Sequence, residues 1–295
     1  MKIRILVNPA AGGGRGRRML PFFRQQAAAW GGELVVSADA EDVRRHAKQS
    51  VDEGVDRLVG VGGDGTFHLI IQELASSHCT LGLVPLGRGN DLACSLGIPR
   101  NAKEALDLAL QGEDRKIDLG EVDGRYFGVY GGVGFDGEVA GFVNRHRKFL
   151  KGPLGYVLGT LSTLATFVPP VIRIVDDEGS FEGRAMFVVI SNCPRFGGGM
   201  MVAPQAEVND GYLDVTIVKK VSRLELLRVF PKVYRGAHLD HPAIISHRTR
   251  TVEIQLDRRQ AMFGDGEEMF DIGPEGKVIR VRPGVLRVVT PGAGP

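Results

Sequence analysis

A strand-like run of apolar residues, Leu58 to Val61, leads directly into a block of glycines that holds one carboxylate. The block reads Gly62-Gly63-Asp64-Gly65-Thr66, and a helical pattern begins at its last residue. Glycine has no Cβ, so backbone N–H groups can close on a phosphate here, and the following helix N-terminus favours negative charge. The block therefore predicts a phosphate-binding loop.

The carboxylate of Asp64 adds a second expectation. A carboxylate repels phosphate unless a metal ion lies between them or the carboxylate orients other groups, so we expect magnesium. The glycines also fit the dinucleotide fingerprint G-x-G-x-x-G, but that fingerprint needs an acid about 20 residues later, and the next strand, Leu81 to Val84, has none. A glycine turn with a purely structural role is the remaining alternative.

Two other expected strands, Ile3 to Val7 and Leu81 to Val84, also end in polar, glycine-rich loops. The polar or turn-forming residues in these loops include Asn8, Pro9, Arg15, Arg88, Asn90 and Asp91. The carboxyl ends of parallel strands face one crevice, so we expect the loops to line one ligand site. Two alternatives stay open, a solvated basic helix start at Arg15 and helix N-capping by Asn90 and Asp91.

The pattern of elements predicts an α/β protein of two domains. Strands and helices alternate with short connections over residues 1–120, which indicates a doubly wound, mostly parallel sheet. Residues 121–295 contain short β runs separated by Gly and Asp, which indicates a β-rich, sandwich-like domain whose last strand returns to the first domain or stays in the second. We expect the active site in the cleft between the domains.

The composition excludes several classes of protein. With 295 residues, 43% of them hydrophobic and 24% charged, the chain has the composition of a soluble globular protein. The chain has 37 Lys and Arg and 35 Asp and Glu, so it lacks the overall positive charge that would favour binding to nucleic acid. The first residues form a short strand and not a signal peptide, and no run reaches the length of a spanning helix. We expect a cytoplasmic protein.

One segment of the second domain suggests contact with a membrane. Arg145, Arg147, Lys148 and Lys151 precede an apolar helical face between Leu154 and Val168. Such a segment can lie on an anionic membrane surface, which would place the protein at the inner membrane face. The alternative is a helix packed on the sheet beside a solvated basic loop. The sequence leaves the choice between a monomer and a homodimer open.

The motifs together resemble the diacylglycerol kinase catalytic-domain family, in particular the soluble bacterial lipid kinases, over nearly the whole chain. Each motif is weak alone, whereas six in this order are specific. They are Asn8-Pro9 with Gly12, the block Gly62 to Thr66, Pro85-Leu86-Gly87 with Asn90-Asp91, Gly134-Phe135-Asp136, Asp210 to Asp214, and Gly264 to Glu267. NAD kinases share the glycine-aspartate block and the two-domain plan but resemble the chain less in the other segments.

The resemblance implies a lipid substrate, with ATP and magnesium as cofactors. The implied nucleotide-binding residues are Asn8, Pro9, Gly12, Ser37, Gly62, Gly63, Asp64, Gly65, Thr66, Arg88, Asn90 and Asp91. It implies a catalytic role for Asp64 and a catalytic base at Glu267 or Asp265, of which we prefer Glu267, with Asp265 orienting it or binding metal. It also implies a structural magnesium site at Glu207, Asp210 and Tyr212, in a turn whose Asp210-Gly211 pair is a hairpin signal without any metal.

Two residues depart from the family pattern. The family usually has Thr where this chain has Arg88, and Asn where it has His68, so nucleotide use is expected to differ.

The predicted function is ATP-dependent phosphorylation of a hydroxyl on a diacylglycerol-like or sphingoid-like lipid. The alternatives are an NAD kinase and a catalytically silent sensor of lipid or nucleotide.

Overall fold

The computed structural model describes residues 1–134 and 167–292. Residues 135–166 contain Asp136, the four predicted basic residues and nearly all of the predicted membrane-facing helix. Those predictions therefore lie outside the described residues. No helix in the described part of the chain is long and apolar enough to cross a membrane.

The first domain is built on a parallel sheet whose strand order is β2-β1-β3-β4. The strands are β1 (Ile3–Val7), β2 (Glu33–Val36), β3 (Arg57–Gly62) and β4 (Thr80–Pro85). Three of them, β1, β3 and β4, are buried along their whole length, which explains their nearly continuous apolar character. The predicted parallel sheet is confirmed.

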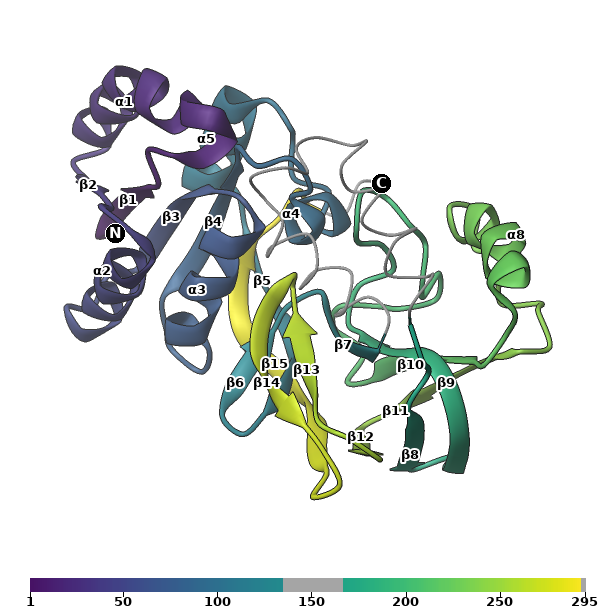
Figure 1. The fold of residues 1–295 in the computed structure, drawn as a ribbon. Helices are drawn as coiled ribbons and strands as arrows, with labels where there is room; N and C mark the ends of the chain where they lie inside the picture. The colour runs from purple at the N-terminus through teal and green to yellow at the C-terminus, as the bar shows by residue number, and fades with distance from the viewer. Residues whose placement is uncertain (135–166, 293–295) are drawn as a thin grey trace.

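Helices cover both faces of this sheet. Figure 1 shows α1 (Ala11–Ala29) and α5 (Ala102–Gln111) on one face, and α2 (Ala40–Asp52) and α3 (Asp64–Leu74) on the other. The short helix α4 (Asp91–Ser95) follows β4. Each loop between a strand and its helix therefore opens at the same edge of the sheet.

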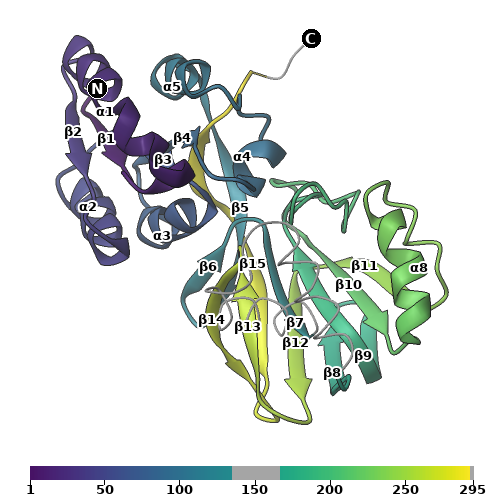
Figure 2. The ribbon, with the colours of Figure 1, turned by 45° about the horizontal axis from the view of Figure 1, so that its top comes forward.

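The last strand joins the two domains. Strand β15 (Lys277–Val289) pairs in parallel with β4 at Val288 and Leu81 and antiparallel with β5 (Asp114–Val122). The sequence pattern shows two separate β runs here, Lys277 to Val281 and Leu286 to Val289, but they form one strand with an irregularity between Arg282 and Leu286. Figure 2 shows β15, in yellow, running from the β-rich domain to the parallel sheet.

The second domain is β-rich, as predicted, and its strands enclose a second apolar core. Its elements are β6 (Arg125–Phe127), β7 (Tyr130–Gly134), β8 (Val171–Asp176), β9 (Gly179–Ser191), β10 (Leu213–Lys219), β11 (Ile244–Thr249), β12 (Thr251–Leu256), β13 (Gln260–Gly264) and β14 (Glu267–Ile272). Ile190, Val215 and Ile254 are among the buried residues of this core. The turn between β13 and β14 carries Asp265 and Gly266, so the sandwich positions the predicted catalytic acids.

Sequence analysis did not predict helix α8 (Arg223–Val233). Its start carries a recognisable signal, because Ser222 caps the helix by accepting a hydrogen bond from the Glu225 N–H at 3.2 Å. The helix covers a small buried cluster with Leu226 and leaves its other face at the surface.

Candidate active site

The glycine block forms the floor of the site because two loops meet there without side chains between them. Gly63 is the residue before α3, and a Cβ on it would lie 3.0 Å from the Gly87 Cα. A Cβ on Gly62 would meet the Thr66 side chain at 2.4 Å. Both glycines are required by packing, because a side chain on Gly63 would push the loops after β3 and β4 apart and a side chain on Gly62 would collide with Thr66 of α3.

The loop after β1 is built on three consecutive glycines. Gly12, Gly13 and Gly14 have φ values of 61°, 65° and 87°, which is the left-handed region that glycine enters without steric cost, and the Gly14 N–H donates to the Ala10 carbonyl at 3.2 Å. A Cβ on Gly13 or Gly14 would meet nothing within 4 Å, so this backbone is open. Asn8 fixes the loop, because its side-chain N–H donates to Thr66 Oγ1 and its Oδ1 accepts from the Ala10 N–H, both at 3.0 Å.

Asp64 holds two helix N-termini together. It is the first residue of α3, and its two carboxylate oxygens accept the N–H groups of Asn90, at 2.7 Å, and of Asp91, at 2.6 Å. The loop before α4 is thereby fixed to the start of α3. The Asp64 carboxylate, for which the sequence suggested a catalytic role, links these two segments through hydrogen bonds.

Asn90 does not cap α4 through its side chain, in contrast to the N-cap alternative. Its backbone is left-handed, with φ of 54°, and its Nδ2 donates instead to the Gly87 carbonyl at 2.9 Å. The Asn90 Oδ1 is buried and has no hydrogen-bond partner among the described residues. A buried, unpaired amide oxygen is costly, and a bound cation or a ligand hydroxyl would satisfy it.

Asp91 lies where negative charges gather. Its Oδ2 accepts the Gly197 N–H at 2.8 Å, so the loop after β9 reaches the first domain. Burial raises the pKa of Asp91, and the negative charges of Asp64 and Asp265 raise it further, against the opposing effect of the backbone N–H groups. The site therefore favours a cation in this position.

Asp265 is held by an unusually complete set of donors. Its carboxylate accepts the N–H groups of Gly128, Val129 and Tyr130 at 2.9, 2.8 and 3.2 Å, and its Oδ2 lies 3.1 Å from His68 Nδ1. The Asp265 side chain is 5% exposed and that of His68 is 1% exposed. A carboxylate so fully bonded is poorly placed to take a proton from a substrate.

Glu267 lies one residue beyond the tip of the same turn, and its surroundings differ from those of Asp265. It is exposed, and its carboxylate forms no hydrogen bond or ion pair within the described residues. A Cβ on Gly65 would lie 2.6 Å from Glu267 Oε1, so this carboxylate reaches over the start of α3. Of the two acids between which sequence analysis chose, Glu267 is the one free to accept a proton.

Two predicted nucleotide contacts occupy different environments. Ser37 is buried, and its hydroxyl donates to the Val7 carbonyl at 3.4 Å, so the side chain stabilises the sheet edge. Arg88 is exposed between Gly87 and Gly89 and forms no ion pair among the described residues. Its guanidinium is available to an anion in the same loop that contacts Gly63.

The turn predicted as a structural metal site contacts the sandwich and not the glycine loops. Asp210 forms an ion pair with Arg248 and accepts the Tyr212 N–H at 2.9 Å. The guanidinium groups of Arg248 and Arg250 each lie over the Tyr212 ring. Glu207 lies near Asp214, whose pKa is raised to about 6 by burial and by the Glu207 charge. The arginine pairing competes with magnesium for Asp210, so the metal at this turn stays a prediction.

No group of three or more His, Cys, Asp and Glu side chains in the described part of the chain could hold a metal ion by itself. Magnesium, however, is commonly bound by one or two carboxylates together with substrate phosphates. The unpaired Asn90 Oδ1 and the raised pKa of Asp91 fit a cation that arrives with a phosphate ligand. The residues present fit magnesium in that form, beside the glycine loops.

Sequence analysis missed three contributors to the site. They are the N–H groups of residues 128–130, the loop carrying Gly197, and His68 as the partner of Asp265. The run Gly197-Gly198-Gly199, with all three residues at positive φ, was a local signal for a special loop. The other two have no local signal, because each depends on a contact between residues far apart in the chain.

Two family models together match nearly the whole chain. Residues 2–122 match the diacylglycerol kinase catalytic domain, and residues 129–290 match the YegS C-terminal NAD kinase beta sandwich-like domain. A diacylglycerol kinase of Mycobacterium tuberculosis is 31% identical over 302 aligned positions, which cover 99% of this chain and 96% of the relative. A diacylglycerol kinase of Bacillus subtilis is 31% identical over 271 positions, covering 90% of this chain and 89% of the relative.

Solved structures show the same fold. The crystal structure of a diacylglycerol kinase from Bacillus anthracis superposes on this chain with a TM-score of 0.80 at 24% identity, covering 99% of this chain and 98% of that chain. A second structure from the same organism gives a TM-score of 0.83 at 25% identity and covers 99% of this chain and 96% of that chain.

Substitutions of the two acids of the β13–β14 turn should change the free energy of unfolding by different amounts. Asp265→Asn places an amide N–H against backbone donors, so we expect the free energy of unfolding to fall by about 2–4 kcal/mol. Glu267→Gln changes an exposed, unbonded carboxylate and should alter that free energy by less than about 0.5 kcal/mol. Denaturant titration of both variants beside the unmodified protein measures the difference, and equal losses would contradict the assignment.

Proposed function

Because the chain belongs to the diacylglycerol kinase catalytic-domain family, we propose that it transfers the γ-phosphate of ATP to a hydroxyl group of a diacylglycerol-like or sphingoid-like lipid. The observation that carries this proposal is the position of Glu267, an exposed and unbonded carboxylate directly over the glycine block. The family relationship supplies the class of reaction, and this geometry supplies a candidate base.

The phosphate chain is proposed to lie along the loops after β1, β3 and β4. The open approach to the backbone at Gly13 and the N-terminus of α3 favour its negative charge. Arg88 adds a full positive charge from the loop after β4, where the family usually has Thr. Positioning and neutralising the phosphates is most of what a protein contributes to phosphoryl transfer.

Glu267 is proposed to accept the proton of the lipid hydroxyl as that oxygen attacks the γ-phosphorus. A base must lie within hydrogen-bond reach of the proton, and Glu267 extends over the start of α3 without a competing partner. Asp265 acts as a positioning residue, because its bonds to residues 128–130 fix the turn that carries Glu267.

Asp64 and His68 are also proposed as positioning residues. Asp64 sets the distance between α3 and the Asn90–Asp91 segment, and His68 contacts the Asp265 carboxylate from the body of α3. Magnesium bound with the nucleotide would neutralise charge on the phosphates, next to Asp91 and the unpaired Asn90 Oδ1.

NAD phosphorylation is the second candidate, because the model that matches residues 129–290 is described as NAD kinase-like. A lipid hydroxyl is preferred because the named relatives that cover nearly the whole chain are diacylglycerol kinases. The two acceptors differ enough in solubility and size for one assay to separate them.

Transfer to a lipid is the first expected outcome. Purified protein with ATP and magnesium should consume ATP when diacylglycerol, monoacylglycerol, phosphatidylglycerol, ceramide or sphingosine is presented in mixed micelles, and the phosphorylated acceptor should be detected by mass. NAD in the same panel serves as the competing acceptor. Phosphorylation of NAD alone would select the second candidate, and nucleotide binding without any transfer would select a sensor.

Glu267→Gln should lower kcat by about 10²–10⁴ and leave the KM for ATP within about twofold, because the amide cannot take the proton and does not touch the phosphate loops. Glu268→Gln, the neighbouring exposed carboxylate on β14, is the matched control and should keep the activity of the unmodified protein. Normal turnover of the Glu267 variant would remove its assigned role.

Arg88→Thr, which restores the usual family residue, should raise the KM for ATP about fivefold through loss of one exposed charge-assisted contact, with a smaller effect at high salt. Arg24→Thr, at an exposed position of α1, is the control. Equal KM values for both variants would show that Arg88 does not contact the nucleotide.

A further inference from the structure

Helix α8 presents an apolar stripe to solvent. Leu224, Leu227, Phe230 and Tyr234 are 58, 46, 46 and 49% exposed, and they are spaced three, three and four residues apart. That spacing places all four on one side of the helix. They are four of the nine large, strongly exposed apolar residues in the described part of the chain, so the stripe is a local concentration and not a general property of the surface.

The stripe borders the face by which α8 packs on the protein. Leu226 is buried with Met186 and Val218, and the partly buried side chains around them include Val221 and Ile244. The helix therefore has a wide apolar arc, and its own sandwich covers only the part around Leu226. The exposed part of the arc has no partner in the described residues.

Basic residues flank this stripe. Arg223, Arg228, Lys232 and Arg235 are exposed and form no ion pair within the described residues, and Lys219 and Lys220 precede the helix. The acid on the helix, Glu225, lies 3.3 Å from His241. The chain as a whole has 37 cationic and 35 acidic residues, so this segment is far more cationic than the average surface.

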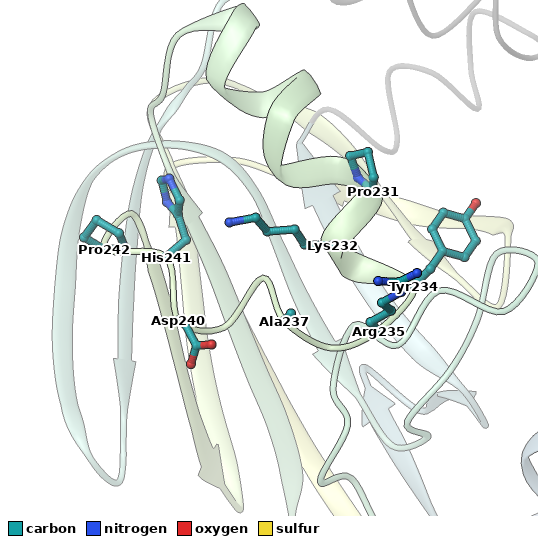
Figure 3. A pocket seen from close by; sticks show the side chains of 8 residues that line it. All are labelled: Pro231, Lys232, Tyr234, Arg235, Ala237, Asp240, His241 and Pro242. Carbon is teal, nitrogen blue, oxygen red and sulfur yellow. The ribbon is translucent and has the colours of Figure 1, made fainter.

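The C-terminal end of α8 borders a hollow of about 840 Å³. Figure 3 shows Lys232, Tyr234 and Arg235 on the helix side of it and His241 and Pro242 on the opposite side. The hollow lies apart from the glycine loops and adds a concave, partly cationic surface to the end of the stripe.

Helix α8 is connected to the candidate active site by one loop. The Met201 N–H donates to the Val233 carbonyl at 3.0 Å, and Gly197, four residues earlier, donates to Asp91. The aromatic ring of Phe196 stacks on Tyr130 at 3.8 Å, and the Tyr130 N–H is one of the groups that hold Asp265. Figure 2 shows this loop between α4 and α8.

We propose that α8 docks the protein on an anionic lipid bilayer, with the apolar stripe inserted at the headgroup boundary and the basic residues on anionic headgroups. An apolar face bordered by Lys and Arg has the two attractions that bind helices at this interface. A second copy of the chain is a poorer occupant, because a symmetric contact would bring the same basic residues together. The role of docking in lipid delivery, but not the docking itself, rests on the proposed function.

The test measures vesicle binding without nucleotide. The intact protein should sediment with vesicles of phosphatidylcholine and phosphatidylglycerol and bind pure phosphatidylcholine vesicles much more weakly. The double variant Leu227→Ser/Phe230→Ser should lower the partition coefficient at least about tenfold. Arg228→Gln and Lys232→Gln should lower it about fivefold for each removed charge.

Matched controls come from exposed residues on other elements. Trp30 and Val175 are 40 and 39% exposed, so Trp30→Ser/Val175→Ser removes comparable apolar surface away from α8. Arg24→Gln/Arg115→Gln removes two exposed charges. Undiminished binding of the α8 variants, or equal losses in the controls, would overturn the proposal. Concentration-dependent dimers that the stripe variant abolishes, without vesicle binding by the intact protein, would assign the face to a second copy instead.

A separate activity arm distinguishes this proposal from the proposed function. If both hold, the stripe variant loses activity on vesicle-borne diacylglycerol but keeps it on a short-chain diacylglycerol that is soluble as a monomer. Vesicle binding without any lipid phosphorylation by the intact protein would reject the kinase assignment and leave the docking surface in place. Lipid phosphorylation by the intact protein, together with unchanged vesicle binding by the stripe variant, would support the kinase assignment and reject the docking surface.

Discussion

The hydrogen bonding of the Asp265 carboxylate is the constraint on which the site depends. A buried carboxylate is tolerated only when donors surround it, and here three consecutive backbone N–H groups and a histidine of the other domain do so. To reach them, Asp265 adopts a left-handed backbone with φ of 54° at the tip of the β13–β14 turn. The turn, the start of β7 and α3 are therefore fixed relative to one another, and the direction of Glu267 follows from that.

Asp64 fixes the loops of the first domain in the same way, by accepting backbone N–H groups. The N-termini of α3 and α4 carry unpaired N–H groups at the same edge of the sheet, and one carboxylate satisfies two of those of the second helix. Of the four acids near the site, Asp64 and Asp265 are thus saturated by backbone donors, whereas Glu267 is free and Asp91 accepts an N–H from a loop of the other domain. The division follows from hydrogen bonding and could not be read from the residue types, since all four side chains are carboxylates.

The sequence contained most of the fold because the relevant signals are local. Buried strands followed by glycines predicted the parallel sheet and its loops, and short runs with turn signals predicted the β-rich domain, both of which the structure confirms. The sequence was less informative where tertiary contacts decide. N-capping was the alternative left open for Asn90, and the left-handed backbone of that residue and its bond to Gly87 are set by the approach of two loops. Helix α8 was missed because its apolar residues spread over a wide arc and obscure the narrow periodicity by which helices are recognised.

The arrangement of acids also bears on what the site can bind. Burial raises the pKa of Asp91, and the neighbouring negative charges of Asp64 and Asp265 raise it further. A bare polyphosphate would add to this repulsion, whereas a polyphosphate that carries a divalent cation would relieve it. The described side chains include no group of three or more His, Cys, Asp and Glu that could hold a cation alone, so in the proposed function the cation arrives with the phosphate. On that proposal, the same carboxylates that fix the loops through backbone N–H groups would favour a metal-bound nucleotide over a free one.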